Sequence, residues 1–426
     1  MKPLHSFLRV VACTALLSAA VFSPAASGQK IELWTFVGPG DANVRERAMS
    51  HVISTFKAKN PGIDVNVTLM PWQQLSPTLL RAVKSGQVPD VAMLYSPSMP
   101  AHIAAGTLTP LKPYIDDWTP AQRSDLVALP ETRDRQGNVF GVPWEMRVSG
   151  LGYRADLLEA AKKRPPQSIK EWGETASALA TPDLAGLAIG FSPEAPSVAA
   201  GWFLTTLVGS GVKVLTDDGK AAFNTPQAER LVQWVLDLSA NGKQAIPQNV
   251  ALQGLEQAQT LFIAQKAVFL PQSSQRFEFI RERSKLGDKV KLAPYPGWEE
   301  GKPSPALVQS WSLVIPKGAK NAQAAWKFID HWTSTSVQVE SAKMAGYVPV
   351  RTSALSDPWF NEPKADVIRW AVDYAGKHPL QFNFPENTEA LYDTWAKMFG
   401  QVLTGKMTPK EGLAWAETEY NRRGGR

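Results

Sequence analysis

The order of strand and helix patterns in the first hundred residues constrains the fold of this chain most strongly. Residues 31–36, 63–69 and 91–95 carry strand patterns; the second alternates apolar and polar side chains, and the third is a continuous apolar run typical of a buried parallel strand. Between them, residues 44–56 and 75–83 place apolar side chains at helical spacing. This alternation predicts an open parallel sheet with helices on both faces.

A second set of such patterns begins after the heptapeptide Gly141-Val142-Pro143-Trp144-Glu145-Met146-Arg147. Strands are predicted at 150–153, 187–191, 267–270 and 290–293, with helices at 156–163, 168–180 and around Leu231 to Leu238. Because 426 residues exceed what one core usually holds, we expect two lobes. The predicted fold class is α/β, each lobe an open, mostly parallel sheet flanked by helices. The predicted boundaries are 29–142 with 296–348 for one lobe and 143–295 with 349–426 for the other.

The first 28 residues have the pattern of a secretory signal peptide. Lys2 and Arg9 precede an apolar run over 10–22, and Ala25-Ala26-Ser27 provides small residues at the cleavage spacing. Cys13, the only cysteine, lies in this run, so the mature chain would contain no disulfide or reactive thiol. A long secreted chain without cysteine fits a bacterial periplasm.

The remaining composition excludes several classes of function. Without Lys2 and Arg9 the chain has 43 basic and 39 acidic side chains, and no basic block is interleaved with aromatics as in nucleic-acid-binding proteins. No cofactor motif is present, and the four histidines after residue 28, His51, His102, His331 and His378, stand far apart in the sequence, without metal-site spacing. The sequence therefore predicts no enzyme, cofactor or metal. A secreted carbohydrate-active enzyme remains the alternative, because a carboxylate pair for glycoside hydrolysis assembles only in space.

Tryptophan is abundant, at 15 residues. Seven lie in predicted helices, where core packing is the better explanation for most of them. Five lie at strand ends or in loops, where ligands bind in open parallel sheets. For these five, a binding role and core packing are both open: Trp34, Trp72, Trp144, Trp298 and Trp311.

Short segments along nearly the whole mature chain resemble the extracellular solute-binding proteins of ABC importers, in the group that binds sugars and related compounds. Their order and spacing carry the resemblance. The matching segments are Ile31-Glu32-Leu33-Trp34, 56–63 (FKAKNPGI), 81–91 (RAVKSGQVPDV), 106–111 (GTLTPL), 141–144 (GVPW), 153–158 (YRADLL), 317–321 (KGAKN) and 325–329 (AWKFI).

This resemblance implies two lobes joined by crossing strands, with a ligand cleft between them that closes around a sugar. It also implies permease subunits in the inner membrane as partners and no chemical reaction, and we expect a monomer. By the same resemblance and by their positions, the candidate ligand-binding residues are Phe36, Asp41, Trp72, Gln73, Tyr95, Ser96, Trp144, Glu145, Arg147, Gln272, Ser273, Gln309, Ser310, Trp311, Tyr347 and Arg351.

The charge of the solute stays open at this stage. The sequence has Gln309-Ser310 where the family often has Gly-Gly, which predicts a more polar pocket. Arg147 and Arg351 raise the alternative of an anionic solute, such as a sugar acid or a glycerol phosphate. Asp41 is predicted to cap the first helix and thus to compete with an anion, so a neutral sugar is preferred. Pairing of Arg147 with Glu145 is the purely structural alternative.

Overall fold

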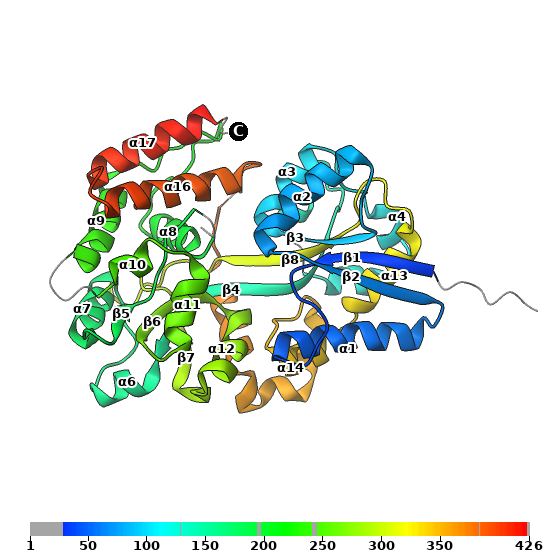
Figure 1. Cartoon of the computed structure of the whole chain (residues 1–426), viewed down its shortest axis with the longest axis horizontal. Coiled ribbons are helices and arrows are strands. Elements are labelled where there is room, and N and C mark those ends of the chain that lie inside the picture. The colour runs from blue at the N-terminus through cyan, green and yellow to red at the C-terminus, as the bar shows by residue number, and fades with distance from the viewer. Residues whose placement is uncertain (1–28, 128, 194–196, 241–244, 383, 424–426) are drawn as a thin grey trace, which may run out of the picture.

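The computed structural model describes residues 29–426 except 128, 194–196, 241–244, 383 and 424–426. The predicted signal peptide therefore lies outside the described residues. The described part forms two lobes side by side, joined by strands that run between them (Figure 1). The predicted α/β class with two lobes is confirmed.

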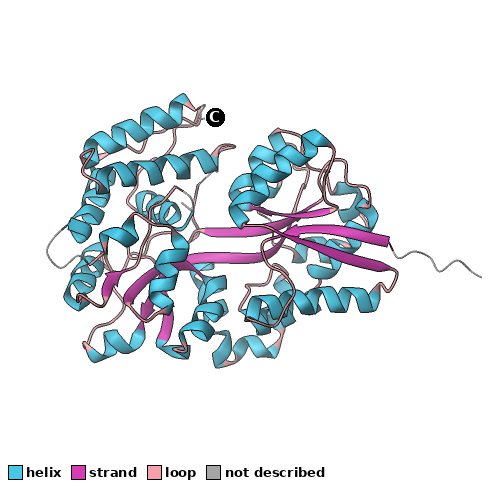
Figure 2. Ribbon diagram, in the orientation of Figure 1, coloured by secondary structure: helices cyan, strands magenta, loops and turns pink. Residues whose placement is uncertain are grey.

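The strands of the described residues form one eight-stranded network in the order β2-β1-β3-β8-β4-β6-β5, with β7 paired to β4 (Figure 2). Only β1 with β2, β1 with β3, and β5 with β6 pair in parallel; the pairs made by β4 and β8 are antiparallel. The strands are β1 (Gln29–Thr35), β2 (Ile63–Leu69), β3 (Val91–Tyr95), β4 (Val142–Arg154), β5 (Ala185–Leu187), β6 (Ala267–Ser273), β7 (Val290–Ala293) and β8 (Val308–Val314).

Strand β4 crosses from one lobe to the other. Its first half pairs with β8, from Val142 to Val148, and its second half pairs with β6 and β7, from Ser149 to Arg154. The sequence predicted a separate strand from residue 150, whereas the heptapeptide belongs to the same strand. A register shift between Pro143 and Glu145 accommodates the proline, which has no N–H group for a regular ladder.

Lobe 1 contains β1, β2, β3 and β8 between two layers of helices. In β3, Val91 and Met93 face a core with α1 and α13, while Leu94 faces a core with α2 and α3. Helix α2 ends at Gly86, whose φ of 72° is the left-handed conformation expected at a glycine cap. The helices of this lobe are α1 (Val44–Lys59), α2 (Trp72–Ser85), α3 (Met99–Ala104), α4 (Lys112–Ile115), α5 (Pro120–Asp125), α13 (Ala322–Trp332) and α14 (Thr335–Ala345).

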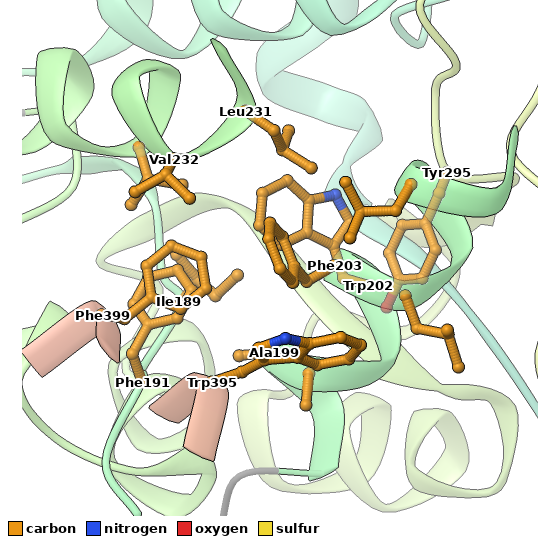
Figure 3. Packing of buried hydrophobic residues seen from close by; sticks show 14 of the residues in the cluster. Ile189, Phe191, Ala199, Trp202, Phe203, Leu231, Val232, Tyr295, Trp395 and Phe399 are labelled. Carbon is orange, nitrogen blue, oxygen red and sulfur yellow. The ribbon is translucent and has the colours of Figure 1, made fainter. Parts of the chain in front are cut away.

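Lobe 2 surrounds β5, β6 and β7 and has an aromatic core (Figure 3). Phe203 of α8 packs edge-on against Trp395 of α16 at 5.1 Å between ring centroids, and Phe191 stacks on Phe399 at 4.2 Å. The strand predicted at 187–191 is wrong, because β5 ends at Leu187 and the next residues enter this core as irregular chain. The helices are α6 (Ala155–Ala160), α7 (Ile169–Leu179), α8 (Ser197–Gly209), α9 (Pro226–Ala240), α10 (Gln248–Ala251), α11 (Leu255–Ile263), α12 (Phe277–Ser284), α15 (Asp366–Lys377), α16 (Thr388–Leu403) and α17 (Pro409–Arg422).

The exact lobe boundaries stay a prediction. In the described part of the chain, no helix has the length and apolar character needed to cross a membrane.

Candidate functional site

The carboxyl ends of the three parallel strands of lobe 1 bring aromatic side chains together. Phe36 follows β1, Trp72 opens the helix after β2, and Tyr95 ends β3. All three surround Trp311 of β8: its ring centroid lies 4.3 Å from Phe36, 5.3 Å from Tyr95 in a stacked arrangement, and 6.4 Å from Trp72. This aromatic wall combines predicted residues that are far apart in the sequence.

Beside the wall, the crossing strands present a buried polar floor. Glu145 pairs with Trp311 and Arg147 with Gln309, so these side chains share one face of the sheet. Glu145 is 1% exposed and Arg147 is 7% exposed. Arg147 donates from Nη2 to Ser273 Oγ at 3.3 Å, and its guanidinium lies 5.0 Å from the Tyr95 ring centroid. With the Gln275 amide oxygen turned toward it, Arg147 also donates to that oxygen from Nη2 at 2.8 Å.

The wall and the floor enclose a cavity between the lobes with a volume of about 20 Å³. Four of its lining residues were not predicted: Arg45 in the first turn of α1, Leu255 at the start of α11, and Gln275 and Arg276 after β6. Gln275 and Arg276 follow the carboxyl end of β6, the same signal that identified Phe36 and Trp72. Arg45 has no such signal, because its sequence position suggests an ordinary helix surface. The other lining residues are Phe36, Trp72, Glu145, Arg147 and Trp311.

Electrostatically, the cavity combines three guanidinium groups with one carboxyl group. Burial raises the pKa of Glu145 to about 7, against the opposing effect of the positive charges of Arg147, Arg45 and Arg276. Burial and the charge of Arg45 lower the pKa of Arg276 to about 10, so this guanidinium stays protonated at neutral pH. Arg276 donates to Glu256 at 3.0 Å, and Arg45 lies 5.3 Å from the Phe36 ring centroid.

Three buried polar atoms at this site have no hydrogen-bond partner among the described residues. They are the donors Arg45 Nε and Gln309 Nε2 and the acceptor Glu145 Oε2. An unsatisfied buried polar atom costs about 1–3 kcal/mol, so native proteins rarely keep several in one place without a purpose. The floor therefore offers both donors and an acceptor to a polar solute.

Trp144 and Arg351, two of the predicted ligand-binding residues, do not line this cavity. Trp144 is 3% exposed and packs in the lobe 1 core, 5.1 Å from the Trp332 ring centroid and 5.0 Å from that of Tyr347. Arg351 is 4% exposed; its Nε donates to Thr333 O at 2.9 Å and its guanidinium lies 4.4 Å from the Trp118 ring centroid. Both side chains are committed to contacts within the fold.

Asp41 does not cap the first helix as predicted. The cap of α1 is Asn43, whose side chain accepts from the backbone N–H groups of Arg45 and Glu46, and Asp41 is exposed. A two-residue displacement of the helix start accounts for the difference.

The remaining predicted residues lie around the cavity without lining it. Gln272 and Ser273 are inside β6 rather than after it, and Gln272 donates to Gln259 at 3.3 Å. Ser96 Oγ accepts from the N–H group of Ser310, which fixes β8 beside the end of β3. Gln73 is half-buried, and Tyr347 is buried against Trp144. Ligand contacts by these residues stay predictions.

The lobes touch each other on both sides of the cavity. Arg47 of α1 forms an ion pair with Glu282 of α12 at 2.8 Å, and Ser98 donates to Glu389 of α16. Trp72 packs against Leu255 across the cleft. Since 20 Å³ holds about one water molecule, a larger solute requires these contacts to open.

A larger hollow of about 790 Å³ lies between residues 100–104 and residues 379–382 and 384–386. Its floor includes Val308, the neighbour of Gln309 on the opposite face of β8, and Phe140 and Phe384 line it. It does not lie at the strand ends that hold the buried arginines, so we place the functional site in the smaller cavity. Among the described residues, no group of three or more His, Cys, Asp or Glu side chains is arranged to hold a metal ion.

Two α/β lobes with crossing strands and a polar, aromatic cleft between them define a two-lobed binding protein. The chain belongs to the bacterial extracellular solute-binding proteins, whose family profile matches residues 51–367. It is 23% identical over 338 residues to the arabinooligosaccharide-binding protein of Bacillus subtilis (strain 168), covering 76% of this chain and 74% of that protein.

Solved structures share the fold. Maltose-bound MalE3 of T. maritima superposes with a TM-score of 0.80 at 23% identity, covering 92% of this chain and 99% of that one. A solute-binding protein of an ABC transporter from Agrobacterium radiobacter K84, in complex with ribitol, superposes with a TM-score of 0.80 at 20% identity. The match covers 93% of this chain and 99% of that one. At these identities the likeness shows the fold alone.

Proposed function

We propose that this protein captures a sugar or a sugar-like polyhydroxylated solute in the cleft between its lobes and delivers it to an ABC importer in the inner membrane. The observation that carries this proposal is the aromatic wall of Phe36, Trp72 and Trp311 beside the unpaired polar atoms of Glu145 and Gln309. Aromatic faces pack against the C–H faces of a sugar ring, while donors and acceptors bind its hydroxyl groups.

Comparison with known proteins supports the same solute class. The similar proteins are an arabinooligosaccharide-binding protein, a protein bound to maltose and a protein in complex with ribitol, and these three ligands all carry several hydroxyl groups. The family is extracellular by its description, which supports secretion through a signal peptide over residues 1–28 and residence in the periplasm.

The mechanism is a shift between open and closed arrangements of the lobes. Lobe 1 supplies Phe36 and Trp311, whereas lobe 2 supplies Leu255 and Arg276. A solute that contacts both sets stabilises the closed arrangement, because it loses half of its contacts when the lobes separate.

A glycoside hydrolase is the rival from another class. Such enzymes ordinarily use two carboxyl groups on either side of the scissile bond. Among the described residues that line the cavity, Glu145 is the only one with a carboxyl group. This supports binding without chemistry.

Isothermal titration calorimetry of the purified protein against monosaccharides, oligosaccharides and polyols tests the proposal. We expect one saturable site for at least one of these solutes, weakened about tenfold or more by Trp72→Ala. Steady release of product from an oligosaccharide, or the absence of binding by the whole panel, would contradict the proposal.

A further inference from the structure

The charge balance of the cavity points to the chemical class of the solute. Its described lining holds three guanidinium groups, from Arg45, Arg147 and Arg276, against the single carboxyl group of Glu145. Building on the proposed function, we propose that the solute is an acidic sugar with one carboxylate, and that these arginines bind this carboxylate.

Arg147 is buried without a direct ion pair to an acidic side chain. Its recorded contacts are with neutral groups: Ser273 Oγ, the Gln275 amide and the Tyr95 ring. Among the described residues, no carboxylate oxygen lies within 4.0 Å of its guanidinium nitrogens. The charges of Glu145 and Arg147 interact, but the direct ion pair considered from the sequence does not form. A buried charge is ordinarily paired, since its desolvation costs several kcal/mol. A carboxylate on the solute would supply the missing partner.

The sum of the charges around the cavity favours a solute with one negative charge over a solute with two. Glu256 neutralises part of the positive charge from outside the lining, through its ion pair with Arg276. With Glu145 ionised, as it is above its pKa of about 7, three guanidinium groups against Glu145 and Glu256 leave one positive charge. A sugar carboxylate balances this charge, while the second charge of a phosphate ester would be repelled by the buried carboxyl group of Glu145.

The arginines that line the cavity come from both sides of the cleft. Arg45 belongs to lobe 1, Arg147 lies on the crossing strand β4, and Arg276 follows β6 in lobe 2. A carboxylate held between them gains charge-assisted hydrogen bonds, often bidentate, only when the lobes are together. The acidic group would thus promote closure, while the aromatic wall and Gln309 contact the rest of the sugar.

Matched pairs of solutes test this inference by calorimetry on the purified protein. The pairs are D-glucuronate with D-glucose, D-galacturonate with D-galactose, and D-gluconate with D-glucitol; glycerol 3-phosphate with glycerol provides the phosphate arm. We expect at least one carboxylate to bind about tenfold or more tightly than its neutral partner, and this preference to shrink at high salt.

Variants of the protein test whether Arg147 produces the preference for the acidic solute. Arg147→Gln should remove the preference for the acid, measured as the ratio of the affinity for the acid to the affinity for its neutral partner. The matched control is Arg164→Gln, which removes one exposed positive charge far from the cavity and should keep the preference. The comparison of solute pairs on the unmodified protein stands even if Arg147→Gln does not fold.

The outcomes separate this inference from the proposed function. Tight binding of a neutral sugar with weaker binding of its acid would overturn the acidic-sugar assignment and leave the sugar-binding function in place. Tighter binding of glycerol 3-phosphate than of any carboxylate would overturn the assignment of a solute with a single negative charge. Binding of none of these solutes would overturn both proposals.

Discussion

Replacing Trp144 by alanine should destabilise the fold and leave solute binding nearly unchanged. The indole ring is 3% exposed and packs against Trp332 and Tyr347 in the core of lobe 1. A buried tryptophan removes roughly 200 Å² of surface from water, worth about 5 kcal/mol at ~25 cal/mol per Å². Because alanine retains part of this burial and leaves a cavity, we expect a loss of about 3–5 kcal/mol in the free energy of unfolding.

Urea unfolding followed by circular dichroism measures this loss, and calorimetry measures the affinity for the best-binding solute. Trp72→Ala is the matched comparison, because Trp72 is half-buried at the cavity. It should cost about 1–2 kcal/mol of stability and tenfold or more in affinity. If Trp144→Ala unfolds like the unmodified protein but binds the solute much more weakly, the assignment of this residue to the core is wrong.

Three further predictions concern charged groups. Because burial raises the pKa of Glu145 from 4.5 to about 7, the folded protein keeps a proton that the unfolded chain releases between these values. Its free energy of unfolding should therefore fall as the pH rises from 4.5 to 7, by up to roughly 3 kcal/mol, and urea titrations across this range should show a smaller fall for Glu145→Gln. Arg351→Lys should lose the planar contact with Trp118 and lower stability by about 1–3 kcal/mol, without a calorimetric change in solute affinity; a tenfold weaker affinity would restore Arg351 to the site. A double-mutant cycle of Arg47→Gln and Glu282→Gln should show at most about 1 kcal/mol of coupling in solute binding, because this ion pair between the lobes is partly exposed; a much larger value would mean that it dominates closure.

The sequence predicts most of the architecture because periodicity reflects burial directly. The strands beginning at Gln29, Ile63 and Val91 and the helices between them follow their hydrophobic patterns. The length of β4 was missed because Pro143 and Gly150 are typical strand breakers. Inside the protein, a register shift accommodates Pro143, and Gly150 lies close to the ring of Trp370, where a Cβ atom would clash.

The site is only partly predictable for a different reason. Residues that follow strands, such as Phe36 and Trp72, can be placed by topology alone. Adjacent residues in a strand point to opposite faces, so Trp144 and Glu145 could not both face the cavity, and the shift at Pro143 concealed which one does. Arg45 reaches the site only because of how α1 packs in the fold, and no local sequence pattern predicts that packing.

The central claim is that a solute binds between lobes that must separate to admit it. In the chain from residue 29, which contains no cysteine, Arg47→Cys with Glu282→Cys places one thiol on each lobe beside the cavity. A short bismaleimide should link them and hold the lobes together. Stopped-flow tryptophan fluorescence then measures the uptake of the best-binding solute of the calorimetric panels. We predict that the linked protein takes up no added solute and retains solute bound before linking; uptake at the same rate by linked and unlinked protein would contradict the claim.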